Sequence, residues 1–253
     1  MHPINYGLEG KVFVVTGGSR GIGFEIARCL LEQKARVVIC GRKQNGLERA
    51  AEKLAAGKDL LPLAAHIAKT EAVDVLFDQT LQRFGRLDGL INNVGMNIIS
   101  GVVDADPDVW RKIIDSNLNG TFLCSRKAGQ ILREQQKGKI VNISSIAAQR
   151  SAPAMGIYGV AKAGIEMLTK VMAQELAPFN VQVNAVAPCM VRTGFSEPFW
   201  SDKVLHDAVV NTIPLGRIAE PIDIAHPTLF LCSAGSDFMT GQTLNVDGGA
   251  SAI

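Results

Sequence analysis

A tyrosine and a lysine four positions apart, Tyr158 and Lys162, are the residues whose types and spacing point most directly to chemistry. On a helix, side chains at this spacing lie on one face, so the phenol and the ammonium would be neighbours. A nearby positive charge favours the phenolate and lowers the tyrosine pKa, which would make the phenol usable as a general acid or base near neutral pH. Such a pair is common by chance, and an exposed pair without a function is the plain alternative.

Further polar side chains could join this pair. They stand at the ends of two apolar strand-like runs and inside one long helical pattern: Ser144, Ser145, Asn92, Asn93 and Asn117. Ligand sites of parallel sheets lie at the carboxyl ends of the strands, so residues that end strands are expected at the same edge. The sequence therefore places these groups near one another.

A glycine-rich segment from Thr16 to Gly23 lies between an apolar strand-like run and a helical pattern. Gly17 can adopt a backbone conformation that is closed to other residues. Gly21 and Gly23 let the main chain approach a pyrophosphate and let the helix pack closely on the sheet. The helix start offers free N–H groups and a positive dipole end to an anion. Strand, loop and helix in this order predict a dinucleotide phosphate site, against the alternative of a glycine turn without a ligand.

The elements that must position these residues alternate along nearly the whole chain. Strands are predicted at 11–16, 36–40, 60–64, 87–91, 139–143, 181–186 and 243–246. Helices are predicted at 22–33, 45–56, 70–84, about 107–135, 157–177 and 220–233, with Asp106 as N-cap and Pro107 at the first helical position of the fourth. This alternation predicts an α/β fold, a Rossmann-type doubly wound parallel sheet of about seven strands, in a single domain over 1–253.

Composition narrows the class of protein. The 253 residues are 47% hydrophobic and 6% aromatic, which predicts a large aliphatic core. A net charge of +2 argues against nucleic acid as a partner. The five cysteines are scattered, and the four histidines show no metal-ligand spacing, so no metal is expected. The chain shows no secretion signal and no apolar run long enough to span a bilayer, so we expect a soluble cytoplasmic protein.

One irregular and aromatic-rich stretch lies at about 190–216. Its position between the sixth strand and the next helix predicts a lid over a pocket. A surface excursion that packs on a partner subunit is the alternative. Its apolar content favours a hydrophobic or amphipathic substrate over a free sugar. The predicted pocket residues are Ser145, Met155, Cys189, Phe195, Phe199 and Trp200.

The chain resembles the short-chain dehydrogenase/reductase family over essentially its whole length. The motifs that carry the resemblance are the TGxxxGxG loop (16–23), NNxG (92–95), Asn117, Ser145, the YxxxK pair, NAVAP (184–188) and GQTxxVDGG (241–249). The resemblance implies a catalytic set of Asn117, Ser145, Tyr158 and Lys162 and a nicotinamide cofactor.

Each catalytic residue then has an implied role. Ser145, whose spacing to Tyr158 fits the family serine, would hydrogen-bond the substrate oxygen, and Ser144 would be structural. Tyr158 would transfer the proton to or from that oxygen. Lys162 would hold the nicotinamide ribose and lower the tyrosine pKa. Asn117 would hold a water that links Lys162 to solvent.

The resemblance also assigns the cofactor site and shows three departures from the family pattern. The expected contacts are Gly17, Ser19, Arg20, Ile22, Gly23, Arg42, His66, Ile67, Asn93, Gly95, Tyr158, Lys162, Pro188, Val191 and Thr193. Val94 occupies the position where the family usually has alanine, and it adds bulk beside a ribose. Cys189 stands for the usual glycine, as a small apolar wall residue or as a reactive thiol. His66 stands for the frequent acidic residue and would pack on adenine or have no role.

The end of the second predicted strand bears on the choice of cofactor. An NAD site places a carboxylate there, but this chain reads Cys40-Gly41-Arg42-Lys43, and Arg20 is a second base nearby. Two guanidinium groups suit a 2′-phosphate, which predicts NADP(H). In the alternative, Arg42 and Lys43 are only a solvated helix start.

The implied activity is interconversion of a ketone or aldehyde and a secondary alcohol. A general carbonyl reductase is favoured. A 3-oxoacyl-[acyl-carrier-protein] reductase is the first alternative, but the basic patch for the carrier looks incomplete, with 178–180 reading Pro-Phe-Asn where an arginine is frequent. A non-catalytic dinucleotide-binding regulator is less favoured, because all four catalytic positions are filled. The resemblance further implies a homotetramer, with the helices at 107–135 and 157–177 in one interface and the last strand and the tail 250–253 in another.

Overall fold

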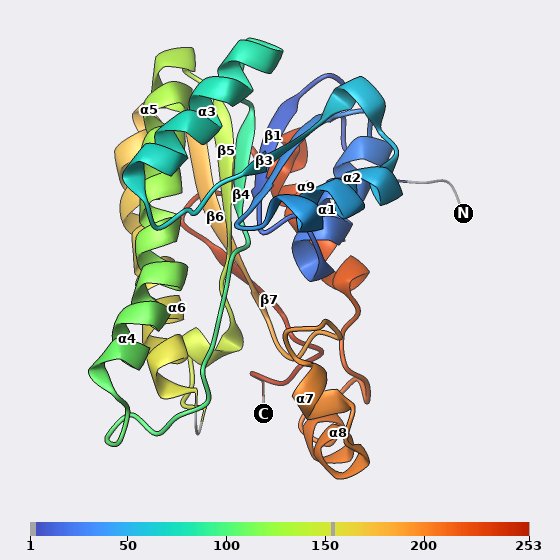
Figure 1. Cartoon of the computed structure of the whole chain (residues 1–253), viewed down its shortest axis with the longest axis vertical. Coiled ribbons are helices and arrows are strands. Elements are labelled where there is room, and N and C mark those ends of the chain that lie inside the picture. The colour runs from blue at the N-terminus through green and yellow to red at the C-terminus, as the bar shows by residue number, and fades with distance from the viewer. Residues whose placement is uncertain (1–3, 153–154, 253) are drawn as a thin grey trace.

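The computed structural model describes residues 4–152 and 155–252, so the expectations for residues 1–3 and for Ile253 lie outside the described residues. Seven parallel strands form one sheet in the order β3-β2-β1-β4-β5-β6-β7 (Figure 1). The strands are β1 (Val12–Thr16), β2 (Arg36–Gly41), β3 (Leu60–Ala64), β4 (Gly89–Asn92), β5 (Gly138–Ile143), β6 (Val181–Pro188) and β7 (Thr243–Val246). The predicted fold class is thereby confirmed.

Helices cover both faces of the sheet (Figure 1). They are α1 (Gly21–Glu32), α2 (Gln44–Leu54), α3 (Thr70–Phe84), α4 (Pro107–Ile114), α5 (Gly120–Gln135), α6 (Gly156–Leu176), α7 (Glu197–Trp200), α8 (Lys203–Val210) and α9 (Pro221–Cys232). Side chains of α1, α2 and α9 share one core with the sheet, and side chains of α3, α5 and α6 share the other. The fold is therefore a three-layer sandwich.

Successive residues of the central strands serve opposite cores. On β1, Val15 joins the core under α1 and α9, whereas Val14 joins the core under α3, α5 and α6. All five residues of β1 are buried. A strand covered on both faces reads as an unbroken aliphatic run, which explains why the sequence pattern located these strands to within a few residues.

The predicted long helix over about 107–135 is interrupted. Its start is as predicted, because Asp106 caps it by accepting a bond from the Asp108 N–H at 2.6 Å. A π-helical turn over Asp115–Asn119 then separates α4 from α5. The Asn117 amide donates to the Ile113 carbonyl at 2.8 Å and thus competes with the backbone ladder. The turn widens the helix where Asn117 meets the segment after β4.

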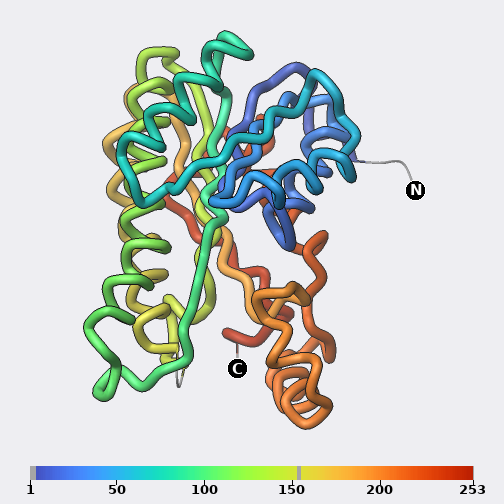
Figure 2. Tube along the Cα trace, in the orientation of Figure 1, coloured from blue at the N-terminus to red at the C-terminus, as the bar shows by residue number. Residues whose placement is uncertain are grey.

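The strand order reverses at β1, between β2 on one side and β4 on the other. Ligands of such sheets bind at the carboxyl ends of the strands beside this point. The glycine loop follows β1, and Asn93 to Gly95 follow β4, so both lie at this edge. The chain trace shows that the segment between β4 and α4 and the α7–α8 segment both extend beyond the same edge (Figure 2).

Candidate active site

A cavity of about 1110 Å³ runs along the carboxyl edge of the sheet. It is lined by the glycine loop, the β2–α2 turn, the segments after β4, β5 and β6, and α6. Every predicted cofactor residue except Gly23 lines it, as do Ser145, Met155, Cys189 and Phe195 of the predicted substrate pocket. One continuous space therefore joins the two groups of residues that the sequence assigned to cofactor and substrate.

The glycine loop is packed so closely that side chains would not fit in it. A Cβ at Gly17 would lie 2.9 Å from Asn93 Nδ2, and a Cβ at Gly23 would lie 2.4 Å from the same atom. Gly17 also has a φ of 69°, in the region that favours glycine. The Asn93 amide donates to the Thr16 carbonyl at 3.0 Å and so fixes the loop to the end of β4. Gly23 thus serves helix packing, and Asn93 holds the loop in shape.

The start of α1 is suited to an anion. No side chain caps its first turn, and Arg20 at the N-cap has extended backbone. The N–H groups of that turn are therefore left for a ligand, with the positive end of the helix dipole behind them. With the glycine cradle beside it, this helix start fits a dinucleotide pyrophosphate.

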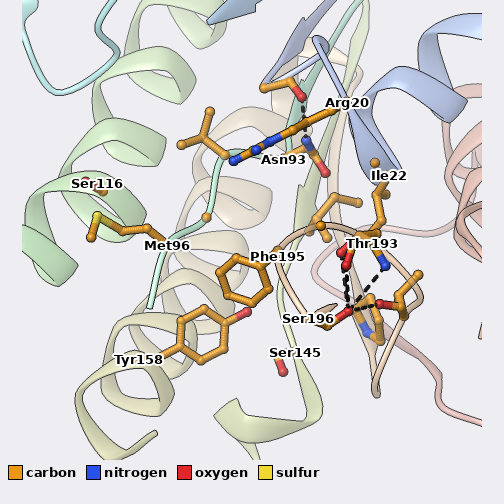
Figure 3. A pocket seen from close by; sticks show the side chains of 18 of the residues that line it. Arg20, Ile22, Asn93, Met96, Ser116, Ser145, Tyr158, Thr193, Phe195 and Ser196 are labelled. Atoms are coloured by element: carbon orange, nitrogen blue, oxygen red, sulfur yellow. Dashed lines mark hydrogen bonds between the residues drawn. The ribbon is translucent and has the colours of Figure 1, made fainter. Parts of the chain in front are cut away.

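Tyr158 lies near Ser145 at the cavity wall (Figure 3). Lys162 follows one turn later on the same buried face of α6. Both are buried, and the Lys162 Nζ lies 5.4 Å from the centroid of the Tyr158 ring. Lys162 Nζ donates to the carbonyl of Ile143 at the end of β5, at 2.7 Å. Ser145 Oγ accepts the Ala147 N–H at 3.1 Å and thereby caps the 3-10 turn that follows β5. The neighbouring Ser144 hydroxyl bonds Glu166 at 3.0 Å.

Burial dominates the ionisation of the pair. It raises the pKa of Tyr158 to about 12, although the Ser145 hydroxyl beside the phenol opposes that rise. Burial also lowers the pKa of Lys162 to about 8. The expectation that Lys162 lowers the tyrosine pKa is not met in this structure, because burial is the largest influence on the phenol and the group that opposes it is Ser145 rather than the lysine. At neutral pH the phenol is protonated, which is the form that donates a proton.

Asn117 has a tertiary role that the sequence did not indicate. It is fully buried, and its amide donates to the Met96 carbonyl at 2.8 Å while its oxygen accepts the Met96 N–H at 3.2 Å. A Cβ at Gly95 would lie 3.4 Å from Asn117 Oδ1 and 3.7 Å from Lys162 Nζ. Asn117 thus ties the segment after β4 to the π-helical turn and lies close to the lysine.

The predicted lid contributes less to the cavity than expected. The ring of Phe195 lies 6.2 Å from that of Tyr158 and lines the cavity (Figure 3). Phe199 and Trp200 are not among the described residues that line it, which corrects their assignment to the pocket. The Trp200 indole instead donates to the Thr193 carbonyl at 3.1 Å, and the Arg192 guanidinium lies 5.2 Å from its ring centroid. The indole N–H finds its partner within the lid segment itself.

Other wall residues were missed from the sequence. They are Arg150, Ala152, Val209, Thr212, Ile213 and Ala250. The apolar pattern of 203–213 could have indicated Val209 and Ile213, but nothing local indicates that Arg150 and Ala250 meet. Burial raises the pKa of Cys189, so at neutral pH this residue is a thiol in the wall rather than a thiolate.

The end of the cavity beside β2 is strongly basic. It is lined by Arg20, Arg42, Lys43, Arg49 and Lys53, of which the sequence reasoning missed the last two. None of these five takes part in the ion pairs found among the described residues. No Asp or Glu occurs among the described lining residues. His66 is exposed there, and its Nδ1 accepts the Ala68 N–H at 3.3 Å.

Comparison with known proteins places this site in a family. The family model described as Enoyl-(Acyl carrier protein) reductase matches residues 17–251. The chain is 37% identical over 249 residues to a 3alpha-hydroxysteroid dehydrogenase of Mediterraneibacter gnavus, covering 96% of this chain and 98% of that protein. It is 36% identical to a 3-oxoacyl-[acyl-carrier-protein] reductase of Synechocystis, covering 96% and 97%.

A solved structure agrees with these relatives. The crystal structure of a short-chain type dehydrogenase/reductase from Mycobacterium marinum superposes with a TM-score of 0.92 at 30% identity, covering 98% of each chain. The chain therefore belongs to the short-chain dehydrogenase/reductase family. It is an oxidoreductase that uses a nicotinamide dinucleotide.

Over residues 4–152 and 155–252, no helix combines the length and the apolar character needed to cross a membrane. The same residues hold no group of three or more His, Cys, Asp or Glu side chains placed to bind a metal ion.

Proposed function

We propose that this chain is an NADP(H)-dependent oxidoreductase that interconverts a hydrophobic or amphipathic ketone or aldehyde and its secondary alcohol. One observation carries the proposal: a single cavity has Ser145, Tyr158 and Lys162 at one end, and at the other end five bases that form no ion pair among the described residues. The kinship to a hydroxysteroid dehydrogenase supports an apolar substrate.

The residues of the chain divide the work of such a reaction. The bound nicotinamide supplies or accepts the hydride. The Ser145 hydroxyl and the Tyr158 phenol converge on the place of the substrate oxygen, so both can hydrogen-bond it and stabilise negative charge that develops there. Because the phenol is protonated at neutral pH, Tyr158 can give its proton to that oxygen during reduction. The Phe195 ring lies beside the Tyr158 ring on the cavity wall, with 6.2 Å between their centroids.

Lys162 and Asn117 support the tyrosine. The Lys162 ammonium is held by the Ile143 carbonyl, close enough to the phenol to stabilise the phenolate left after proton transfer. Asn117 fixes the segment that carries Gly95 next to that ammonium. We propose, as the family resemblance implies, that Asn117 also holds the water that returns a proton to the lysine.

A 3-oxoacyl-[acyl-carrier-protein] reductase is the second candidate. The Synechocystis relative favours it, since that protein bears this name and is matched over almost its full length. A carrier-bound substrate would need basic side chains around the substrate end of the cavity. Among the described lining residues of that end, Arg150 is the one cationic side chain at the rim, which favours a free carbonyl compound.

Assembly and location complete the proposal. We propose a homotetramer, because large apolar side chains remain exposed on α4, α5 and α6. We also propose a cytoplasmic location, because all five cysteines are free and four of them are buried.

The cofactor assignment is tested by kinetics with NADPH and NADH. Wild-type enzyme should prefer NADPH. Arg42→Asp should lower kcat/KM with NADPH and change it little, or raise it, with NADH, because a carboxylate repels the 2′-phosphate and can accept a ribose hydroxyl. The preference should move by about one to two decades. Lys137→Asp, an equal charge change at an exposed position before β5, is the control. Equal use of both cofactors by the wild type would contradict the assignment.

A further inference from the structure

The substrate end of the cavity is almost free of charge except at one point. Its walls are built mainly from small and apolar side chains, namely Ile146, Ala147, Ala152, Met155, Cys189, Met190, Phe195, Val209, Ile213 and Ala250. Among the described residues that line this end, the charged side chains are Arg150 and Lys162, and Lys162 is buried against the Ile143 carbonyl. A cation at the rim of an apolar pocket would bind a negatively charged group of a substrate whose remaining part is apolar.

Arg150 is held in place by contacts that leave most of its donors available. Its backbone N–H bonds the Ile146 carbonyl at 3.2 Å, so the residue ends the turn that begins at Ser145. Its Nη1 donates to the Ala250 carbonyl at 2.6 Å, which fixes the direction of the side chain. A guanidinium has five N–H donors in a planar fork that matches a carboxylate. One bond to a carbonyl leaves that fork incomplete.

Within residues 4–152 and 155–252, no carboxylate lies at ion-pair distance from this guanidinium. Asp247 lies in the same region, but its two oxygens accept the N–H groups of Gly249 at 3.0 Å and Ser251 at 2.8 Å. The charges of both residues act on the Cys189 thiol in the cavity wall: after burial, Asp247 raises its pKa, and Arg150 lowers it to a smaller extent.

We propose that Arg150 determines specificity by binding a carboxylate of the substrate. The substrate would be an oxo acid, with the carbonyl at Ser145 and Tyr158, an apolar segment along the pocket wall, and the carboxylate at Arg150. This inference rests on the proposed function and narrows its substrate class. The competing explanation is that Arg150 serves only to hold the C-terminal segment through the Ala250 carbonyl.

The test compares oxo acids with their methyl esters, which keep the carbonyl and the chain but lose the charge. The probes are 4-oxopentanoate, 5-oxohexanoate and 6-oxoheptanoate and their methyl esters, each with NADPH. For the best acid, Arg150→Gln should lower kcat/KM by roughly tenfold or more, because a charge-assisted hydrogen bond is lost. The same variant should leave kcat/KM for the matching ester within about twofold, because the ester makes no such bond.

Arg83→Gln is the matched control. Arg83 is also exposed and also donates to a backbone carbonyl, that of Lys58, at 3.0 Å, but it lies at the C-terminal end of α3 and away from the cavity. This variant should leave the acid-to-ester ratio unchanged. Arg150→Lys keeps the positive charge but lacks the planar fork of donors. Its kcat/KM for the acid should therefore lie between the values for the wild type and for Arg150→Gln.

The outcomes separate the inference from the function on which it rests. Reduction of both members of every pair with equal kcat/KM overturns the role of Arg150 and leaves a carbonyl reductase standing. An Arg150→Gln enzyme that loses acid and ester equally overturns it as well, in favour of the structural role. An enzyme that reduces neither acids nor esters, nor any other carbonyl compound with either cofactor, overturns the proposed function and the inference together.

Discussion

At the scale of single residues, the site places the buried lysine Lys162 next to the buried tyrosine Tyr158, and both side chains are largely shielded from water. Lys162 is 2% exposed and its pKa is lowered to about 8, while the phenol of Tyr158 stays protonated up to a pKa of about 12. Both shifts have the same cause, because burial disfavours the charged form of either group. The carbonyl of Ile143 is the protein group that compensates the ammonium. Such strongly perturbed groups in a cavity are typical of catalytic sites rather than of structural ones.

Replacement of Tyr158 by Phe should separate binding from chemistry. The ring remains to pack against Phe195, but the proton donor is lost. Turnover should fall by about 10²–10⁴-fold, the usual contribution of general acid–base catalysis. Steady-state kinetics measure the loss, and quenching of protein fluorescence by NADPH should show a cofactor Kd close to that of the wild type. A Tyr158→Phe enzyme of normal activity would refute the assignment of Tyr158.

Replacement of Lys162 by Met should stabilise the protein while it inactivates the enzyme. In the folded state the lysine pKa of about 8 lies below its ordinary value of 10.5, so the unfolded chain binds this proton more tightly. The resulting destabilisation is fully present below pH 8 and disappears as pH rises towards 10.5. The free energy of unfolding of the variant should therefore rise by on the order of 1–3 kcal/mol at pH 7, after the loss of the bond to the Ile143 carbonyl is taken into account.

Thermal unfolding at several pH values measures this effect. The gap in Tm between Lys162→Met and the wild type should narrow as pH rises from 8 to 10.5. Lys170→Met, at an exposed position on the same helix, should show no such trend. A gap that stays constant with pH would mean that the lysine is not destabilised by burial.

At the scale of elements, the glycine loop and α1 depend on one close approach. In Gly23→Ala, the new Cβ would lie 2.5 Å from the Gly17 carbonyl oxygen as well as against Asn93, so the backbone of the loop must move. We expect a loss of stability of about 1–3 kcal/mol and weaker NADPH binding. Gly46→Ala on α2 is the control, because its Cβ would meet only the Ser19 Cβ at 3.9 Å. That change should be neutral or slightly stabilising, since glycine weakens helices. Calorimetry and cofactor titration would show the difference, and equal effects of the two variants would contradict it.

The elements also show what a sequence can and cannot predict. Buried parallel strands are aliphatic along their whole length, so the sheet and its glycine loop were predictable from local pattern. The π-helical turn was not, because the Asn117 side chain that competes with the helix ladder also needs the Met96 carbonyl as a partner from another segment. The orientation of Trp200 was missed for a different reason: its indole bonds the Thr193 carbonyl within the lid itself, and no periodic pattern predicts the backbone path of that irregular segment. The place of Arg150 on the cavity wall was not predictable either, because its side chain is held by the Ala250 carbonyl of the C-terminal segment, far away in the sequence.

At the scale of the whole molecule, the outer surface of α4, α5 and α6 carries more apolar area than a solvated face needs. The exposed side chains there are Trp110, Phe122, Val160, Met167 and Val171. Three of them follow one stripe of α6, and the cores of the sheet are already filled from the other sides of these helices. Exposed apolar stripes of this kind are typical of interfaces between proteins, and we propose that a second copy of the chain covers this one.

The tetramer proposal is therefore testable at this stripe. Phe122, about 45% exposed, and Val171, about 44% exposed, should both lie in the interface. The double variant Phe122→Glu with Val171→Glu should shift the mass seen by light scattering from four chains to two or one, because buried carboxylates without partners are costly. Val75→Glu alters an apolar residue on α3 that is somewhat more exposed, at 53%, and should leave the mass unchanged. Because the catalytic tyrosine and lysine sit on the inner face of the same helix α6, dissociation should also lower turnover by loosening that helix. A wild-type protein that is monomeric at working concentration would contradict the tetramer proposal. A double variant that remains tetrameric would show that the interface lies on another face of the molecule.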